Sequence, residues 1–115
     1  VLLLTDGVDA RFIRELLFTG RIFDAAEAAR MGLVNRIVPA ADLDEVVDGY
    51  ARDIAANAPL SVRAAKVVIK EAVKVPHERD ETLCDEVVSA ANLSEDSKEG
   101  ARAFGEKRPP EFTGR

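Results

Sequence analysis

The end of the chain brings together side chains that could bind an anionic ligand. The segment EGARAFGEKRPPEF, residues 99–112, carries Phe104 and Lys107 three positions apart. A lysine ammonium pairs with phosphate as a point charge on a flexible stem, and an aromatic ring beside a cation can stack on a base. The segment therefore predicts either a phosphate-binding surface or the charged end of a helix.

A helix end accounts for the same charges without any ligand. Asp96 and Glu99 lie at the start of a predicted helix, where the helix dipole favours acids and where their spacing is close to that of a capping box. Lys107 and Arg108 fall in its expected last turn, and the two prolines that follow forbid its continuation. In this interpretation Phe104 is the apolar anchor of an amphipathic helix. Both interpretations remain open from the residues alone.

No other group in the sequence assembles an active site or a metal site. His77 is the only histidine, and it stands among charged residues at an expected helix start, which favours a solvated or capping role. Cys84 falls on an apolar stripe and is expected to be a small buried hydrophobe. One thiol and one imidazole do not supply the four ligands of a structural zinc site. We expect no catalytic residue and no metal ligand in this chain.

The spacing of apolar residues predicts a mainly α fold of about six helices and one short strand. Gly20 and Gly32 suit the ends of the first two helices, and Asp24 and Asp42 suit the starts of the second and third. The helices are expected from Val8 to Thr19, from about Ala25 to Met31, from Asp42 through Ile54, from Pro59 to before Pro76, across Leu83 to Ala91, and from Ser94 or Asp96 to the double proline.

The segment LVNRIV, residues 33–38, is the predicted strand, because it is rich in β-branched residues and bounded by Gly32 and Pro39. A strand needs a partner, since its unpaired N–H and C=O groups are costly to bury. We expect that partner to be residues 1–4 or a segment outside this chain.

Composition limits the class of protein. The 115 residues suffice for one domain with a modest core, and a hydrophobic content of 47% indicates a chain that folds. A net charge of −5 argues against a general binder of nucleic acid or of an anionic membrane surface. The single cysteine fits a reducing, cytoplasmic location, and no apolar run approaches the roughly 20 residues of a membrane span. The absence of an initiator methionine suggests a piece of a longer protein.

Two segments resemble the enoyl-CoA hydratase/isomerase (crotonase) family. ELLFTGRIFDAAEAARMGLVNRIVP, residues 15–39, is similar to an internal segment of that family, and SEDSKEGARAFGEKRPPEF, residues 94–112, is similar to its ending. The two stand in the family's order, with NAP at residues 57–59 between them. The resemblance implies a large α/β spiral fold of ββα turns followed by a helical region that packs trimers. This chain looks like that C-terminal helical region alone.

The resemblance also implies an organisation and a parent protein. Residues 1–115 are expected to form a single helical region, in which 1–39 end the spiral core with its connection and 40–115 form the oligomerisation region. The parent is expected to be an enoyl-CoA hydratase-like lyase, a trimer or a dimer of trimers, that hydrates 2-trans-enoyl-CoA in fatty-acid or related catabolism. The family's catalytic carboxylates and oxyanion-hole amides belong upstream of Val1, so the chain itself is predicted to be inactive.

Three residues inherit a binding role by position in the family's ending. In related hydratases the last helices of one subunit reach the CoA site of a neighbour. This implies that Lys107 pairs with a CoA phosphate, that Phe104 packs near the adenine or pantetheine, and that Val88 helps to line the site. CoA enters as part of the substrate, and no separate cofactor is expected. The structural alternatives are a helix cap for Lys107, trimer core for Phe104 and core for Val88.

Two functional alternatives stay open. The chain could be a non-catalytic helical assembly module with no enzymatic parent. Within the family, the parent could be an isomerase, a ring-forming synthase or a thioester hydrolase instead of a hydratase.

Overall fold

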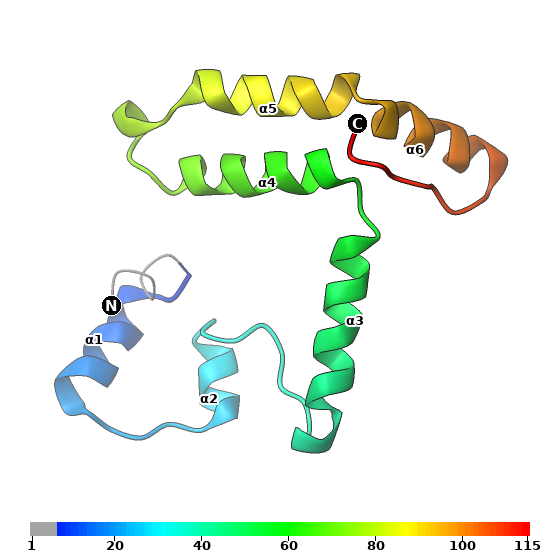
Figure 1. Ribbon diagram of the computed structural model, residues 1–115. Coiled ribbons are helices and arrows are strands. Elements are labelled where there is room, and N and C mark those ends of the chain that lie inside the picture. The colour runs from blue at the N-terminus through cyan, green and yellow to red at the C-terminus, as the bar shows by residue number, and fades with distance from the viewer. Residues whose placement is uncertain (1–6) are drawn as a thin grey trace. The chain divides into compact units, whose positions relative to one another are not determined.

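The chain is mainly helical (Figure 1). The structure, a computed structural model, describes residues 7–115, which form six α-helices and two short 3-10 turns. The predicted mainly α fold of about six helices is therefore confirmed, and none of the described helices is long and apolar enough to cross a membrane. The elements are α1 (Ala10–Thr19), α2 (Ala25–Arg30), η2 (Ala40–Asp42), α3 (Leu43–Ala55), α4 (Pro59–Ala72), η3 (Pro76–Glu78), α5 (Glu81–Leu93) and α6 (Glu95–Glu106).

The chain divides into two compact units. The first ends at Asp44, and the second comprises Glu45–Arg115. This division lies close to the boundary predicted between residues 39 and 40, but it is a division by contacts alone. The roles assigned to the two segments, spiral core and oligomerisation, stay predictions.

The first unit contains two short helices that are capped where the sequence indicates. The Asp24 carboxylate accepts a hydrogen bond at 2.7 Å from the backbone N–H of Glu27 and so starts α2. Gly20 ends α1 with a left-handed φ of 61°, and Gly32 follows α2 with a φ of 75°. Both angles favour glycine, which has no Cβ to crowd the backbone.

Arg21 ties the helices of this unit together. Its guanidinium donates at 2.8 Å to Glu15 on α1 and at 2.9 Å to Glu27 on α2. This pairing lowers the pKa of the Glu27 carboxyl, so the contact joins two charged groups at neutral pH. Ile13 and Met31 are the larger apolar side chains buried here. A small core and one ion-pair network therefore hold the unit.

The prediction of a strand over residues 33–38 is wrong. The segment is irregular, with Val34 39% and Ile37 49% exposed. A strand forms only against a second backbone, and residues 7–115 hold no strand that could pair with it. The partner that the sequence suggested within the chain, residues 1–4, lies outside the described residues.

Helix α3 buries none of its residues. It follows directly on the turn η2, where the backbone N–H of Leu43 already donates to the carbonyl of Ala40. Asp42 directly precedes α3, but among the described residues its carboxylate accepts no hydrogen bond from the start of the helix, so the prediction that Asp42 caps this helix is wrong. The apolar stripe expected on α3 is present but about half exposed, with exposed fractions of 50–57% for Leu43, Val47, Tyr50 and Ile54.

In the second unit α4 and α5 run side by side as a helical hairpin (Figure 1). Glu71, close to the end of α4 and almost completely buried, accepts hydrogen bonds from the backbone N–H of Asp80 at 2.9 Å and from the Lys74 ammonium at 2.7 Å. These donors lower the pKa of the Glu71 carboxyl. Asp80 in turn caps α5 by accepting from the backbone N–H of Leu83 at 2.8 Å. The connection between the helices is thus fixed at both ends by carboxylates.

Ser94 sets the sharp turn from α5 into α6. Its hydroxyl donates to the carbonyl of Ala91 at 2.7 Å and accepts from the backbone N–H of Ser97 at 3.0 Å. One side chain therefore ends one helix and begins the next. The capping box predicted from Asp96 and Glu99 is wrong, because Ser94 takes the capping role and both carboxylates bind residues that follow the helix.

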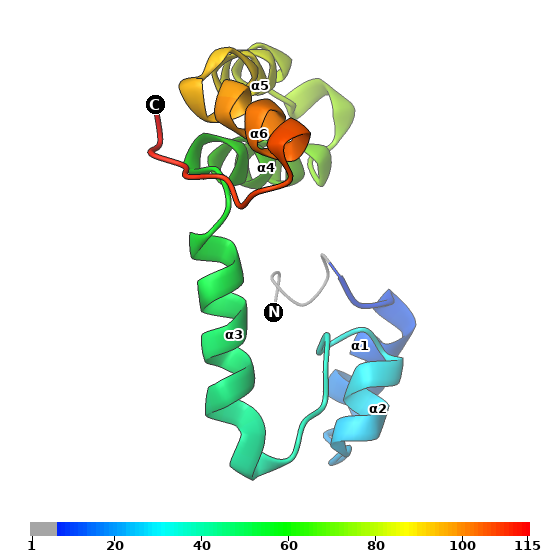
Figure 2. The ribbon, with the colours of Figure 1, turned by 90° about the vertical axis from the view of Figure 1, so that its right-hand side faces the viewer.

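Beyond α6 the chain turns back and runs alongside that helix (Figures 1 and 2). We call residues 108–115 the strap. The backbone N–H of Asp96, at the start of α6, donates at 3.0 Å to the carbonyl of Arg115 at the end of the strap. Phe112 lies beside Gly100, where an added Cβ would stand 3.7 Å from the ring. The strap thus covers one side of α6 along most of its length.

Replacing Asp96 should loosen the strap. The residue is 1% exposed, and its carboxylate accepts from the backbone N–H groups of Thr113 at 2.7 Å and Gly114 at 2.8 Å. Asp96→Ala is expected to lower the free energy of unfolding by about 1–3 kcal/mol, because these donors lose a charged acceptor. Urea unfolding followed by circular dichroism measures the change. The matched control is Glu95→Ala on the exposed side of α6, and equal losses in the two variants would contradict the role of Asp96.

Candidate functional site

Helix α6 ends in a Schellman motif at Lys107, one of the three residues that the sequence assigns to a ligand. The backbone N–H of Lys107 donates to the carbonyl of Phe104 at 3.3 Å, and that of Arg108 donates to the carbonyl of Ala103 at 3.1 Å. In this motif the residue after the helix takes a left-handed conformation, and Lys107 has φ 55° and ψ 39°. Lys107 and Arg108 therefore follow the helix, whereas the sequence placed them in its last turn.

A left-handed lysine carries a conformational cost. Its Cβ crowds the following carbonyl, which costs roughly 1–2 kcal/mol that glycine, the usual residue here, does not incur. Among residues 7–115, Lys107 is the only non-glycine residue with a positive φ. Strain of this kind gathers at functional sites, where a particular side chain is needed at a particular place. The conformation therefore singles out Lys107 within this helix end.

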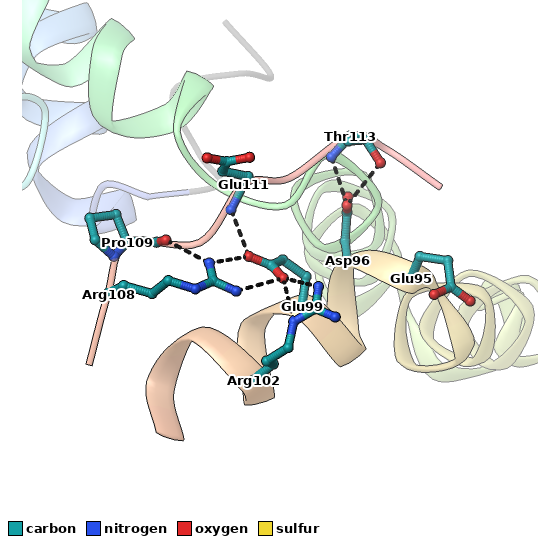
Figure 3. Close-up of a pocket in the computed structure, with 8 residues that line it drawn as sticks. All are labelled: Glu95, Asp96, Glu99, Arg102, Arg108, Pro109, Glu111 and Thr113. Atoms are coloured by element: carbon teal, nitrogen blue, oxygen red, sulfur yellow. Dashed lines mark hydrogen bonds and ion pairs between the residues drawn. The ribbon is translucent and has the colours of Figure 1, made fainter. Parts of the chain in front are cut away.

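Glu99 clamps the residue after Lys107 against α6 (Figure 3). Its carboxylate accepts from the Arg108 guanidinium at 2.6 and 3.1 Å, from Arg102 at 3.1 Å, and from the backbone N–H of Glu111 at 3.1 Å. These donors, Arg108 foremost, hold the pKa of the Glu99 carboxyl far below its usual range, and the carboxylate raises the pKa of Arg108. Glu99 is therefore ionised at neutral and mildly acidic pH, and the strap stays pinned.

Both arginines near the end of α6 form ion pairs within the described residues, and Lys107 does not. Arg108 contacts Glu106 at 2.7 Å in addition to Glu99, and Arg102 contacts Glu99. Lys107 is exposed and forms no ion pair with the residues that the structure describes. An exposed ammonium without an internal counter-ion can pair with an anion from outside the chain.

Phe104 and Val88 are exposed on two different helices. Phe104 lies on α6, three residues before Lys107, and is 88% exposed. Val88 lies near the middle of α5 and is 40% exposed. The structure thus brings Phe104 and Lys107 together at one helix end and leaves Val88 on a neighbouring helix. Neither apolar side chain belongs to the core of this chain, and their assignment to a ligand stays a prediction.

A groove of about 550 Å³ lies between α6 and the strap (Figure 3). Both of its arginines pair with Glu99, so the groove is the interior of the clamp rather than an open anion site. None of the three residues predicted to bind a ligand lines it. The lining residues are Glu95, Asp96, Glu99, Arg102, Arg108, Pro109, Glu111 and Thr113.

Sequence reasoning missed the two carboxylates that organise this end of the chain. Asp96 and Glu99 stand three residues apart, so they lie on the same side of the helix. The available signal was the double proline at 109–110, which turns the chain out of the helix while keeping it extended. Several of the strap's contacts come from backbone N–H groups, however, and these look the same in every sequence.

Neither His77 nor Cys84 belongs to a reactive arrangement. His77 lies exposed in η3, and Cys84 is half-buried on α5. Burial, together with the charges of nearby acids such as Glu71, raises the pKa of the Cys84 thiol, which disfavours the nucleophilic thiolate. No group of three or more His, Cys, Asp or Glu residues in the described part of the chain is arranged to hold a metal ion.

The first unit contains a separate hollow of about 260 Å³. Its lining is mainly apolar and includes Ile13, Leu16 and Phe23. The charged residue in the lining, Arg21, is engaged in ion pairs with acids on α1 and α2. The hollow supplies apolar surface and no reactive group.

Comparison with known proteins decides the family. The sequence model described as enoyl-CoA hydratase/isomerase matches residues 1–115. The chain belongs to the enoyl-CoA hydratase/isomerase family. It is 40% identical to enoyl-CoA hydratase EchA19 of Mycobacterium tuberculosis over 101 residues, which cover 88% of this chain and 38% of that protein. It is 37% identical to carnitinyl-CoA dehydratase of Proteus mirabilis over an alignment of 119 residues, which covers 100% of this chain and 46% of that protein.

Solved structures of enoyl-CoA hydratases also match most of this chain. Enoyl-CoA hydratase EchA1 from Mycobacterium marinum matches with a TM-score of 0.88 and 32% identity, over 99% of this chain and 45% of that one. The chain spans somewhat less than half the length of the curated relatives it matches, as the coverages of 38% and 46% show. The resemblance read from residues 15–39 and 94–112 is confirmed, and the chain corresponds to a portion of a family member.

Lys107→Gly separates the cost of the left-handed conformation from the use of the side chain. Removing the Cβ relieves the strain, so the free energy of unfolding of this chain is expected to rise by about 1 kcal/mol. Lys107→Ala keeps the Cβ and serves as the control, for which no such rise is expected. Urea unfolding of both variants measures the difference. A glycine variant no more stable than the alanine variant would show that the conformation carries no strain.

Proposed function

We propose that this chain is the C-terminal part of an enoyl-CoA hydratase-like enzyme and supplies one portion of the binding site for the CoA half of the substrate. Relatives named enoyl-CoA hydratase and carnitinyl-CoA dehydratase match nearly all of the chain, which supports a CoA thioester as substrate. The observation that carries the site is Lys107, an exposed ammonium without an ion-pair partner in the described chain, held in a strained conformation at the end of α6. The reaction of the whole protein is hydration of 2-trans-enoyl-CoA in fatty-acid or related catabolism.

Three residues make the proposed contacts with CoA. The Lys107 ammonium pairs with a phosphate group, whose oxygens are strong acceptors for a charged donor. The ring of Phe104 is almost fully exposed and packs near the adenine or pantetheine, where a flat apolar surface is favourable. Val88 contributes a smaller apolar surface from α5. CoA is part of the substrate, and no separate cofactor is proposed.

The bond-making chemistry belongs to residues outside this chain. Hydration requires backbone N–H groups that polarise the thioester carbonyl and carboxylates that move protons between water and the acyl chain. A carboxylate that exchanges protons needs a pKa near the working pH, whereas the pKa of Glu99 is far below it and Asp96 is enclosed by the strap. Neither carboxylate fits that role, the family resemblance carries no catalytic residue over to this chain, and the chain by itself is proposed to be inactive. Isomerase, synthase and thioester hydrolase remain alternative activities for the parent.

The exposed apolar helices are assigned to contacts between subunits. The stripe on α3, represented by Val47 and Tyr50, is about half exposed, and Phe104 is more exposed still. Large apolar side chains left exposed on several helices often mark a surface that another subunit covers. The parent is proposed to be a cytoplasmic homotrimer or dimer of trimers. The same surface also favours the second candidate function, a helical assembly module without an enzymatic role.

Lys107→Ala in the complete protein that contains this chain tests the CoA contact. KM for an enoyl-CoA substrate is expected to rise about fivefold, corresponding to about 1 kcal/mol for a partly exposed charged contact, with kcat little changed. Steady-state hydration of crotonyl-CoA, followed by loss of enoyl absorbance, measures both constants. The isolated 115-residue chain is the blank and should hydrate no substrate. An unchanged KM would remove Lys107 from the site.

Self-association of the isolated chain tests the assigned subunit surface. Sedimentation equilibrium of the 12.5 kDa chain is expected to give a mass above that of the monomer, because association covers apolar surface. Val47→Glu, on the exposed stripe of α3, should shift the mass toward the monomer, and Glu45→Gln on the same helix is the matched control. A monomeric mass at all concentrations would contradict the assignment. Self-association of a complete protein that binds no CoA would favour the assembly module.

A further inference from the structure

We propose that Glu99 is a positioning residue for Lys107, because the strap that it clamps holds the lysine in the left-handed conformation that presents its ammonium to CoA. The inference rests on the proposed function and extends it, since it gives a ligand-binding role to a side chain that touches no ligand. It makes the strap part of the binding site's architecture rather than a terminal tail.

The connection from Glu99 to Lys107 runs through Arg108. Arg108 directly follows Lys107, and its two terminal nitrogens lie 2.6 and 3.1 Å from the Glu99 carboxylate. A two-pronged contact fixes orientation as well as distance. The backbone N–H of Arg108 also donates to the carbonyl of Ala103 at 3.1 Å. Because both the side chain and the main chain of Arg108 are held, the peptide that joins it to Lys107 has little freedom.

Further contacts keep the rest of the strap in place. The backbone N–H of Glu111 donates to Glu99 at 3.1 Å, and those of Thr113 and Gly114 donate to Asp96 at 2.7 and 2.8 Å. Both acids are nearly buried on one side of α6. The strap is therefore anchored from its first residue almost to its last, and it cannot swing away from Lys107 without losing several charge-assisted hydrogen bonds.

Lys107 needs this support because its conformation is unfavourable by itself. The last turn of a helix frays readily, and a lysine released from the Schellman motif would leave the left-handed region. A lysine side chain already has four rotatable bonds, so a mobile backbone would spread its ammonium over a large volume. Holding the backbone reduces the entropy lost when the ammonium meets a phosphate, and such preorganisation strengthens binding.

A purely electrostatic role for Glu99 predicts the opposite effect on CoA binding. Its negative charge occupies Arg102 and Arg108 and repels a nearby phosphate. On charge alone, neutralising Glu99 would release two guanidinium groups and tighten the binding of CoA. If Glu99 acts by positioning Lys107, neutralising it loosens the strap and weakens binding. The sign of the change therefore separates the two explanations.

The experiment is a double-mutant cycle in the complete protein, with CoA as the probe. Glu99→Gln preserves the size of the side chain and removes its charge, and Lys107→Ala removes the ammonium. Calorimetry gives the dissociation constant of CoA for each single variant and for the combination, and steady-state assays give KM and kcat for crotonyl-CoA. Glu95→Gln is the matched control, since Glu95 is an exposed acid on the same helix that pairs with Lys98.

The expected result is coupling between the two positions. Lys107→Ala should weaken CoA binding about fivefold, the equivalent of one partly exposed charged contact. Glu99→Gln should weaken it by about twofold to fivefold, raise KM to the same extent, and leave kcat almost unchanged. In the Lys107→Ala background, Glu99→Gln should cause no further loss of CoA affinity, because it acts only through the lysine. A merely stabilising role would lower Tm without this dependence on Lys107.

Each contrary outcome overturns a different statement. An unchanged or tighter CoA complex in Glu99→Gln, or an equal loss with and without Lys107, overturns the positioning role and leaves the proposed CoA contact intact. An unchanged dissociation constant in Lys107→Ala overturns the CoA contact itself. Should Glu99→Gln fail to fold, Arg108→Lys replaces it, because lysine keeps the positive charge and loses the two-pronged contact. The absence of coupling between Arg108→Lys and Lys107→Ala would then overturn the inference.

Discussion

The ionised carboxylate of Glu99 is the contact on which the C-terminal end of this chain depends. It is 8% exposed, and a charge so far removed from water is costly unless donors surround it. Donors come from the helix and from the strap: Arg102 lies within α6, Arg108 begins the strap, and the backbone N–H of Glu111 lies further along it. All of these donors are needed together, because removing one leaves the buried charge of Glu99 partly unsatisfied. Helix, helix end and strap therefore form one cooperative arrangement.

Carboxylates have this importance because the apolar core of the second unit is small. Its buried apolar residues are the alanines Ala64, Ala91 and Ala103, which let backbones approach but remove little apolar area from water. Glu71 fixes the hairpin connection, and Glu99 fixes the strap. The larger apolar side chains are half-buried or, like Ile69 and Leu93, exposed. Charged hydrogen bonds therefore contribute much of what holds the unit together, and its exposed apolar surface is the one proposed above for contacts between subunits.

The sequence predicted the features that depend on neighbouring residues and failed on those that depend on distant ones. Gly20, Asp24 and Pro59 mark helix boundaries correctly, because capping and proline geometry act within one turn. The strand over residues 33–38 failed because pairing requires a second backbone, which local β-propensity does not supply. The assignment of Asp96 and Glu99 to a capping box failed for a related reason, since their true partners lie 9 to 18 residues further along the chain.

The same arrangement explains why the spacing of residues in the tail matters. Phe104 supplies the carbonyl that accepts the N–H of Lys107, so the ring and the ammonium belong to one Schellman motif and cannot be shifted independently. The arginine comes next, where its side chain pairs with Glu99 and its backbone N–H completes the motif. A glycine in place of Lys107 would end the helix at lower conformational cost and would present no charge. A lysine there gains a function only if its backbone is held, and the acid placed two turns earlier on α6 does the holding.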